Sequence, residues 1–203
     1  MADMILRTTL TSPFGRKSRL AAAVLGLAER IEVVVADMFD DNDSLRLQNP
    51  LGKMPTLVLG DGSTLYDSRV IAEYLDHLAG GGRIIPAEPV ARFAALKLQA
   101  IGDGILDAGV LRRLEALFRE APLRSERWLA YQSGKIGRAL DELNAAPPSE
   151  SDILVGEIAV ACGLGFLDFR LGGDNWRASR PRLADWFERF AGRCPGFAET
   201  LPR

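Results

Sequence analysis

The chain has 203 residues, which suffices for one large domain or two small ones. Its hydrophobic content of 47%, charged content of 26% and formal net charge of -2 are ordinary for a globular protein and leave no electrostatic footprint for nucleic acid or an anionic membrane. We find no membrane-spanning stretch, no secretion signal and no metal-binding spacing among two cysteines and one histidine, so we expect a cytoplasmic protein with no metal and with neither nucleic-acid nor membrane partners.

The first half of the chain alternates between strand-like and helix-like patterns. In chain order we expect a strand over 5–9, a helix over 14–27, a strand over 32–35, a short irregular helix within 39–48, a hairpin of strands 56–59 and 64–66, and a helix over 68–78. A strand, a helix and a strand within about 30 residues predict a parallel pair with a right-handed crossover. This order, βαβαββα, indicates a compact α/β domain over 1–79.

The second half shows helical periodicity and no convincing strand. Glycines break the pattern within 80–89, which we interpret as a linker, and 90–203 forms the second domain. The expected helices cover 90–118, 125–143, 153–171 and 181–191. The third of these is unusually apolar, so we place it at the buried centre of an all-helical domain.

Thr11-Ser12-Pro13 precedes the first helix and has two compatible readings. In the first reading the motif only starts the helix, because serine is a good N-cap and proline a good first helical residue. A capping hydroxyl accepts a backbone hydrogen bond and keeps its own proton to donate, for example to a ligand thiolate above the helix. Helix N-termini also lower the pKa of thiols.

Two further motifs also have both a structural and a ligand-binding interpretation. Met54-Pro55 is either the start of an edge strand or a place where the backbone of Met54 pairs with an extended peptide ligand. Asp67-Ser68 is either a simple helix cap or an anion-binding helix N-terminus.

These three motifs, in this order within βαβαββα and followed by an all-helical half, resemble the glutathione S-transferase superfamily. The resemblance covers nearly the whole chain and includes Ile84-Ile85-Pro86, similar to the interdomain linker, and Pro195-Gly196-Phe197, similar to a C-terminal pattern. It implies a thioredoxin-like N-terminal domain that binds glutathione, an all-α C-terminal domain that binds a second substrate, and a homodimer.

The resemblance also implies roles at the thiol of glutathione. Ser12 would donate a hydrogen bond to the sulfur and favour the thiolate, with Thr11 as the alternative donor. Met54 would pair its backbone with the cysteinyl unit, and the bond to Pro55 would be cis.

Three more residues would hold the ends of glutathione. Ser68 and its backbone N–H would bind the γ-glutamyl carboxylate, and Asp67 would help with the γ-glutamyl amine. Lys53 would reach the glycyl end.

The chain departs from the family pattern in places. Serine at the catalytic position argues against the mixed-disulfide chemistry of the cysteine classes, and the early segment has no tyrosine. In the second domain the stretch that begins at Leu154 lacks the usual Ser/Thr cap, although Glu157 keeps the carboxylate; Ser151 or Asp152 would cap instead.

Other charged residues have open interpretations. Asp103 and Asp107 lie four apart on one helix and form either a solvated face or polar groups of the second-substrate pocket or dimer interface. Arg16 either strengthens the positive field over the site or is an exposed surface charge, and we expect His77 at the surface.

On this resemblance we expect a cytoplasmic detoxification enzyme, a transferase of alkyl or aryl groups. It would bind glutathione as substrate or cofactor and present the thiolate to a small electrophile or peroxide. Two alternatives stay open: a glutathione-dependent isomerase, and a non-catalytic binding or regulatory module.

Overall fold

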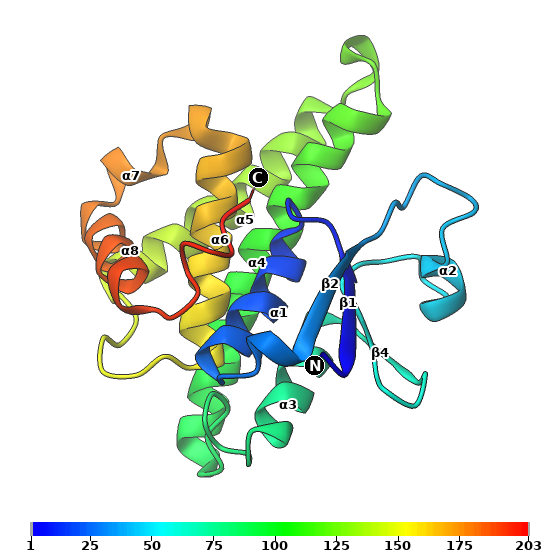
Figure 1. Ribbon diagram of the computed structural model, residues 1–203. Coiled ribbons are helices and arrows are strands. Elements are labelled where there is room, and N and C mark those ends of the chain that lie inside the picture. The colour runs from blue at the N-terminus through cyan, green and yellow to red at the C-terminus, as the bar shows by residue number, and fades with distance from the viewer. Residues whose placement is uncertain (1, 203) are drawn as a thin grey trace. The chain divides into compact units, whose positions relative to one another are not determined.

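The structure is a computed structural model that describes residues 2–202 (Figure 1). Its strands are β1 (Met4–Thr8), β2 (Ile31–Val35), β3 (Thr56–Val58) and β4 (Thr64–Tyr66). Its α-helices are α1 (Pro13–Val24), α2 (Leu45–Gln48), α3 (Ser68–Leu78), α4 (Pro89–Phe118), α5 (Glu126–Ala145), α6 (Val155–Leu171), α7 (Trp176–Ser179) and α8 (Pro181–Arg193). Single 3-10 turns are η1 (Ala28–Arg30), η2 (Ala121–Leu123) and η3 (Gly172–Asp174). The chain divides into two compact units, one of Met1–Phe93 with Cys194–Arg203 and one of Ala94–Arg193.

The first unit is built on a mixed sheet with the strand order β2-β1-β3-β4. Strands β1 and β2 are parallel, whereas β3 runs antiparallel to both β1 and β4. This topology confirms the predicted βαβ unit and the hairpin that follows it. The apolar sides of the sheet and of helices α1 and α3 form the core, in which Leu6, Leu20, Leu57, Ile71 and Leu75 are fully buried.

Helix α1 ends one turn before the expected limit of residue 27. Its last residue is Val24, and Gly26 follows with a φ of 75°. Glycine adopts this left-handed conformation without the steric cost that a Cβ would add, which is why helices commonly end just before it. The chain then makes the short turn η1 before entering β2.

The expected linker is folded against the end of α3. The buried carboxylate of Asp76 accepts hydrogen bonds from the backbone amides of Gly82 at 2.8 Å, Arg83 at 2.9 Å and Ile84 at 2.7 Å. Ile84 and the following Ile85 are buried in consequence. The segment after the glycines is therefore tied to the first unit by Asp76, and also by Arg83, whose Nη1 donates to the carbonyl of Leu25 at 3.1 Å.

The second unit contains helices only among its described elements, as expected. Helix α6 lies at its centre, because nearly every side chain from Val155 to Leu164 is buried. Gly102 of α4 approaches α6 closely: a Cβ there would lie 2.4 Å from the backbone carbon of Ala159. The short helix α7 was not expected, and its Trp176 packs edge-on against Phe187 of α8.

The last residues pack on the first unit. The sequence analysis assigned 90–203 to the helical half, but Cys194–Arg203 returns to α1 after α8 ends. Gly196 has a φ of 75°, and a Cβ there would lie 2.4 Å from the Cβ of Ala23. Arg19 of α1 donates to the carbonyl of Glu199 at 3.1 Å.

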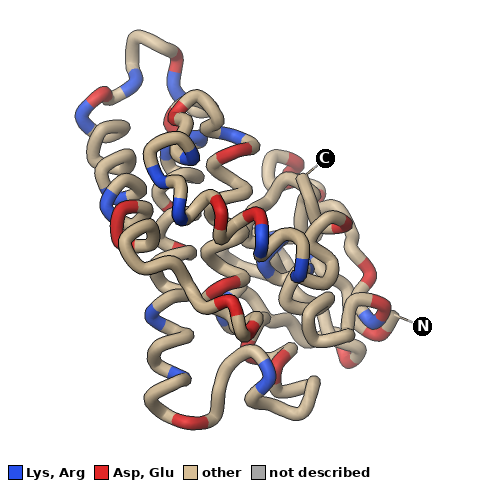
Figure 2. The backbone as a smooth tube through the Cα atoms, turned by 90° about the vertical axis from the view of Figure 1, so that its left-hand side faces the viewer, with Lys and Arg blue, Asp and Glu red and all other residues tan. Residues whose placement is uncertain are grey.

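Charges of both signs are spread along the chain. Lys/Arg and Asp/Glu positions are interspersed along the backbone in Figure 2, in keeping with the formal net charge of -2. Within residues 2–202, none of the helices combines the length and the apolar character that crossing a membrane requires.

Candidate functional site

Ser12 caps helix α1 as expected. Its Oγ accepts from the amide of Gly15 at 3.1 Å, and its backbone carbonyl accepts from Arg16 at 2.8 Å. Because the hydroxyl acts as acceptor in the cap, its own hydrogen can serve another acceptor. Thr11 lies just outside the helix, with its Oγ1 3.4 Å from that of Thr9. Both candidate hydroxyls therefore stand at the N-terminal end of α1.

A close approach between α1 and β1 sets the position of this cap. A Cβ added at Gly15 would lie 2.0 Å from Oγ1 of Thr8, the last residue of β1. Only glycine fits at this distance, since real Cβ contacts are longer by more than an ångström. The first turn of α1 is thus held directly against the end of the strand.

The Met54–Pro55 peptide bond is cis, as expected. The buried side chain of Asn49 holds the surrounding segment: its Nδ2 donates to the carbonyl of Lys53 at 2.8 Å and lies 3.3 Å from Oγ1 of Thr56. Its Oδ1 accepts from the amide of Leu51 at 3.0 Å. Sequence reasoning missed Asn49, although an asparagine before a proline is a signal for such a turn.

Asp67 caps helix α3 in an unusual backbone conformation. Its φ is 69° and its ψ is 127°, and its carboxylate accepts from the amide of Arg69 at 2.9 Å. A residue other than glycine at positive φ is uncommon, and such residues cluster at functional sites. Ser68 follows as the first helical residue and is buried. The cap is confirmed, and the N-terminal amides of α3 form a region suited to an anion.

The register of the sheet brings these three motifs to one end of it. Arg7 of β1 pairs with Thr56 of β3, and Thr56 pairs with Tyr66 of β4. The segment leading to Ser12 follows Arg7, Pro55 precedes Thr56, and Asp67 follows Tyr66. We call this row, Arg7–Thr56–Tyr66, the motif edge. Motifs separated by up to about 55 residues in sequence thus leave neighbouring strands at the same edge.

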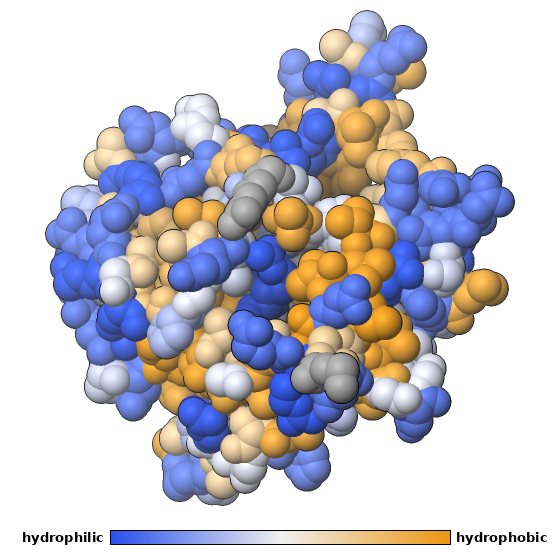
Figure 3. All heavy atoms as spheres, in the orientation of Figure 1, coloured by the Kyte–Doolittle hydropathy of each residue, from blue (hydrophilic) through white to orange (hydrophobic). Residues whose placement is uncertain are grey.

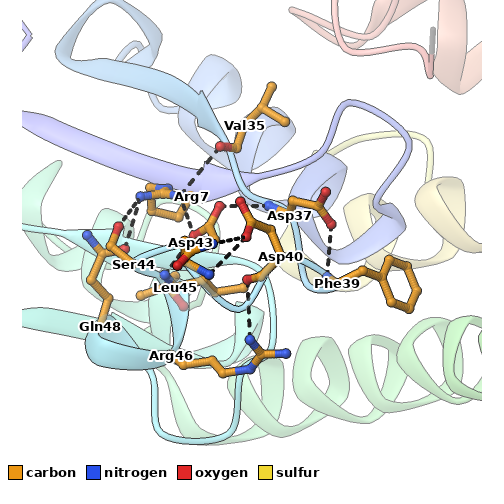
Figure 4. A network of polar contacts seen from close by, with 12 residues as sticks. Arg7, Val35, Asp37, Phe39, Asp40, Asp43, Ser44, Leu45, Arg46 and Gln48 are labelled. Carbon is orange, nitrogen blue, oxygen red and sulfur yellow. Dashed lines mark hydrogen bonds and ion pairs between the residues drawn. The ribbon is translucent and has the colours of Figure 1, made fainter.

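A polar network at the motif edge joins β1 to the segment before α2 (Figure 4). Arg7 donates to Oγ of Ser44 and to Oδ1 of Asp43, each at 2.7 Å. Asp43 also accepts from the amides of Asp37 at 2.8 Å and Leu45 at 2.7 Å. The hydrogen bonds from these two amides have the largest effect in lowering the pKa of the Asp43 carboxyl, and Arg7 lowers it further. Sequence reasoning missed this network, whose signal was an arginine in an otherwise apolar strand.

Apolar side chains are exposed beside this network. Figure 3 shows hydrophobic atoms gathered between hydrophilic ones on the face in view. The exposed large apolar residues from the end of β2 to the start of β3 are Val35, Met38, Phe39, Leu47 and Leu51. The surface next to the motif edge therefore offers both polar and apolar contacts.

The charged residues with open interpretations lie as follows. Arg16 is buried against Phe197, so the expectation of an exposed charge is wrong. Asp103 is buried, which rules out the solvated face for this residue, while Asp107 is exposed. His77 is exposed, as expected.

Helix α6 begins without a hydroxyl cap, as expected. The carboxylate of Glu157 accepts from the amide of Leu154 at 3.1 Å, so Glu157 takes the place that we expected Ser151 or Asp152 to fill. Burial raises the pKa of Glu157 above its ordinary value, against the opposite effect of its backbone hydrogen bonds. Within the described residues, no three His, Cys, Asp or Glu side chains are grouped so that they could hold a metal ion.

Comparisons with known proteins agree with this geometry. The family model of the glutathione S-transferase N-terminal domain matches residues 11–78, which contain all three motifs. An uncharacterised GST-like protein of Escherichia coli K12, YibF, is 32% identical over 203 residues, covering 98% of each chain.

Solved structures extend the likeness to the whole fold. A glutathione transferase family member from Pseudomonas fluorescens Pf-5 with bound glutathione is 38% identical, covers 98% of this chain and 99% of its own, and superposes with a TM-score of 0.92. A glutathione S-transferase from Methylobacillus flagellatus KT with glutathione bound is 32% identical, covers 98% and 100%, and has a TM-score of 0.91. The thioredoxin-like first unit and the helical second unit have the architecture of these proteins, and the chain belongs to the glutathione S-transferase superfamily.

Proposed function

We propose that this protein is a glutathione transferase-like enzyme that binds glutathione at the motif edge and presents its thiolate to a small electrophile or peroxide. The observation that carries the proposal is the register of β1, β3 and β4, which collects the Ser12, Met54–Pro55 and Asp67–Ser68 segments at one end of the sheet. Relatives at 32–38% identity are described with glutathione bound.

Ser12 is the proposed thiolate donor. An ordinary thiol has a pKa of about 8.5, and lowering it by two units requires about 2.7 kcal/mol of preferential thiolate stabilisation. A hydroxyl hydrogen bond and the positive end of α1 act together in that direction. Such a shift changes the thiolate from a few per cent of the population at neutral pH to the majority.

The remaining contacts orient the peptide. The amides at the start of α3, with Ser68 and Asp67, suit the charged γ-glutamyl end. The backbone of Met54, set by the Asn49 contacts, would pair with the cysteinyl unit, and Lys53 would reach the glycyl carboxylate. The residues present therefore fit a small peptide with a carboxylate at each end and a thiol between them.

Bound glutathione supplies a sulfur nucleophile. The residues of this chain favour the ionised form of its thiol and orient the sulfur. The second unit would supply the second-substrate pocket, with Asp103 and Asp107 among its polar groups. The division into a glutathione-binding unit, Met1–Phe93 with Cys194–Arg203, and a second-substrate unit, Ala94–Arg193, belongs to the same proposal. So do a cytoplasmic location, a homodimer, which a mass measurement in solution tests, and a detoxification role.

Binding is tested first, by retention on immobilised glutathione and by thermal shift with free glutathione. We expect both; a protein that shows neither does not have the proposed function. Turnover is then measured over a panel of electrophiles, unsaturated acids and peroxides. Binding without any turnover would replace the enzyme proposal with a binding or regulatory module.

The role of Ser12 is tested by the pH titration of the ultraviolet thiolate absorbance of bound glutathione. Ser12→Gly is the sharpest variant, because glycine costs only a few tenths of a kcal/mol as an N-cap and yet has no hydroxyl. We expect it to raise the bound thiol pKa by one unit or more, while Thr11→Ala leaves it unchanged. The opposite pattern would assign the role to Thr11.

A further inference from the structure

Arg7 joins the sheet to the chain that connects β2 and β3. It lies on β1 at the motif edge and is 9% exposed. Its Nη1 donates to Oγ of Ser44 at 2.7 Å and to Oε1 of Gln48 at 3.4 Å, and its Nη2 donates to Oδ1 of Asp43 at 2.7 Å (Figure 4). A buried cation is costly unless it is paired, and Asp43 supplies the opposite charge. We call residues 37–48, which include these three partners, the α2 segment.

Asp43 extends the hold of Arg7 over the α2 segment. Its Oδ2 accepts from the amide of Asp37 at 2.8 Å, and its Oδ1 accepts from the amide of Leu45 at 2.7 Å. Hydrogen bonds to an ionised carboxylate are stronger than those between neutral groups. Helix α2 has only 4 residues, and so short a helix is not stable by itself. Its position therefore depends on these contacts and on its one buried side chain, Leu45.

The end of α2 leads directly into the turn before Lys53. The amide of Asn49 donates to the carbonyl of Leu45 at 2.8 Å, and its Nδ2 donates to the carbonyl of Lys53 at 2.8 Å. On the outer side, a Cβ added at Gly52 would lie 3.5 Å from Cγ of Arg46. Helix α2 thus contacts the turn at two points, and a displaced α2 would displace Lys53 as well.

The other segments of the proposed site are held independently of the α2 segment. Met54 and its proline precede Thr56, which pairs with Arg7 through the backbone, so a substitution of the Arg7 side chain leaves this pairing in place. The caps of α1 and α3 are each formed by a side chain next to them in sequence. Loss of the Arg7 contacts should therefore affect the Lys53 end of the site and spare the rest.

We propose that Arg7 is a positioning residue that, together with Asp43, holds the α2 segment where Lys53 meets the glycyl carboxylate of glutathione. The pair would thus set the preference for glutathione over γ-glutamylcysteine, the dipeptide that has the same thiol and γ-glutamyl group but no glycine. Arg7 acts through α2 and is not a catalytic residue. The inference rests on the proposed function, because it concerns one end of the same ligand.

The test compares the affinities of the full chain for the two peptides by calorimetric titration. We expect wild type to bind glutathione more tightly than γ-glutamylcysteine. In Arg7→Met the affinity for glutathione should fall about tenfold, which corresponds to ~1.4 kcal/mol, while the affinity for the dipeptide stays within about twofold. Arg7→Lys keeps the charge beside Asp43 but has a single nitrogen, so we expect it to restore part of the preference.

Arg30→Met is the matched control. It removes another arginine–aspartate pair of the first unit, in which Nη2 of Arg30 lies 2.6 Å from Oδ2 of Asp3. This pair lies at the opposite end of the sheet, where Met4 of β1 is the partner of Ile31 of β2. We expect the variant to bind both peptides as wild type does.

Two further measurements carry the test if Arg7→Met does not fold. Asp43→Asn should lower the preference for glutathione in the same direction, because it removes the other half of the ion pair. In wild type, hydrogen–deuterium exchange within residues 37–48 should slow on addition of glutathione and slow less on addition of saturating γ-glutamylcysteine, since only the tripeptide engages the turn that α2 positions.

The outcomes separate this inference from the proposed function. An unchanged preference in a folded Arg7→Met or Asp43→Asn protein would overturn the inference, as would an equal loss of affinity for both peptides. Equal slowing of exchange by the two peptides would also contradict it, although glutathione binding itself would stand. A wild-type protein that binds neither peptide would instead overturn the proposed function, and this inference with it.

Discussion

Replacing Asn49 by alanine removes the side chain that organises the segment before β3. The buried amide makes contacts with the carbonyl of Lys53, the hydroxyl of Thr56 and the amide of Leu51. Thr56 still donates to the Lys53 carbonyl at 3.1 Å, so that acceptor keeps one partner. The substitution therefore loosens the segment without leaving its carbonyl wholly unpaired.

The magnitude follows from these contacts. A net contribution of about 1 kcal/mol per hydrogen bond gives a loss of about 2–3 kcal/mol in the free energy of unfolding. Because the same segment carries the Met54 backbone that we propose to pair with glutathione, its affinity should also fall by about tenfold, which corresponds to ~1.4 kcal/mol.

The assay combines urea denaturation, followed by circular dichroism, with calorimetric titration of glutathione. Thr64→Val is the control: Thr64 donates to the carbonyl of Gln48 at 2.9 Å, and its partner in β3 is Val58, which lies beyond the segment from Lys53 to Thr56. We expect it to cost ~1 kcal/mol or less and to leave the glutathione affinity unchanged. An Asn49→Ala protein within about 0.5 kcal/mol of wild type would refute the reasoning from these three bonds.

Two further substitutions test the packing and the titration of single positions. Gly15→Ala should destabilise the protein by about 1–3 kcal/mol in thermal denaturation, because its Cβ would lie 2.0 Å from Oγ1 of Thr8, and Thr8→Ala in the same chain should restore part of the loss; an unchanged Tm in Gly15→Ala would contradict the close approach. Glu157 has a pKa raised chiefly by burial, so its contribution to stability is fully present below its unfolded pKa of about 4.3 and is lost as pH rises through the folded pKa. Glu157→Gln removes this titration, and the stability of wild type relative to the variant should fall over that pH window; a difference that is constant with pH would be the contrary result.

Local signals predicted most of the fold and part of the site. A capping or turn motif determines the structure of only the few residues next to it. Two helix starts and one hairpin turn could therefore be predicted from the neighbouring residues alone, at Ser12-Pro13, Asp67-Ser68 and Asp61-Gly62. Helix limits were less certain, as the early end of α1 before Gly26 illustrates.

The contacts that could not be predicted from the sequence are made with residues far away in the chain. Arg16 is buried because Phe197 lies over it, 181 residues later. The contacts of Arg7 with Ser44 and of Asn49 with Lys53 likewise exist only once β1 and β3 are paired. The sequence shows which residues are charged, but it does not show which of them a distant segment covers.

The path of the chain makes the helical unit an insertion in the first one, since residues 94–193 separate two stretches that pack together. A nascent chain that has left the ribosome only as far as Phe93 lacks the stretch that covers Arg16 and Ala23. The first unit consequently acquires its final surface around α1 only after synthesis of the helices has finished, and isolated expression of its N-terminal part would yield an incomplete unit.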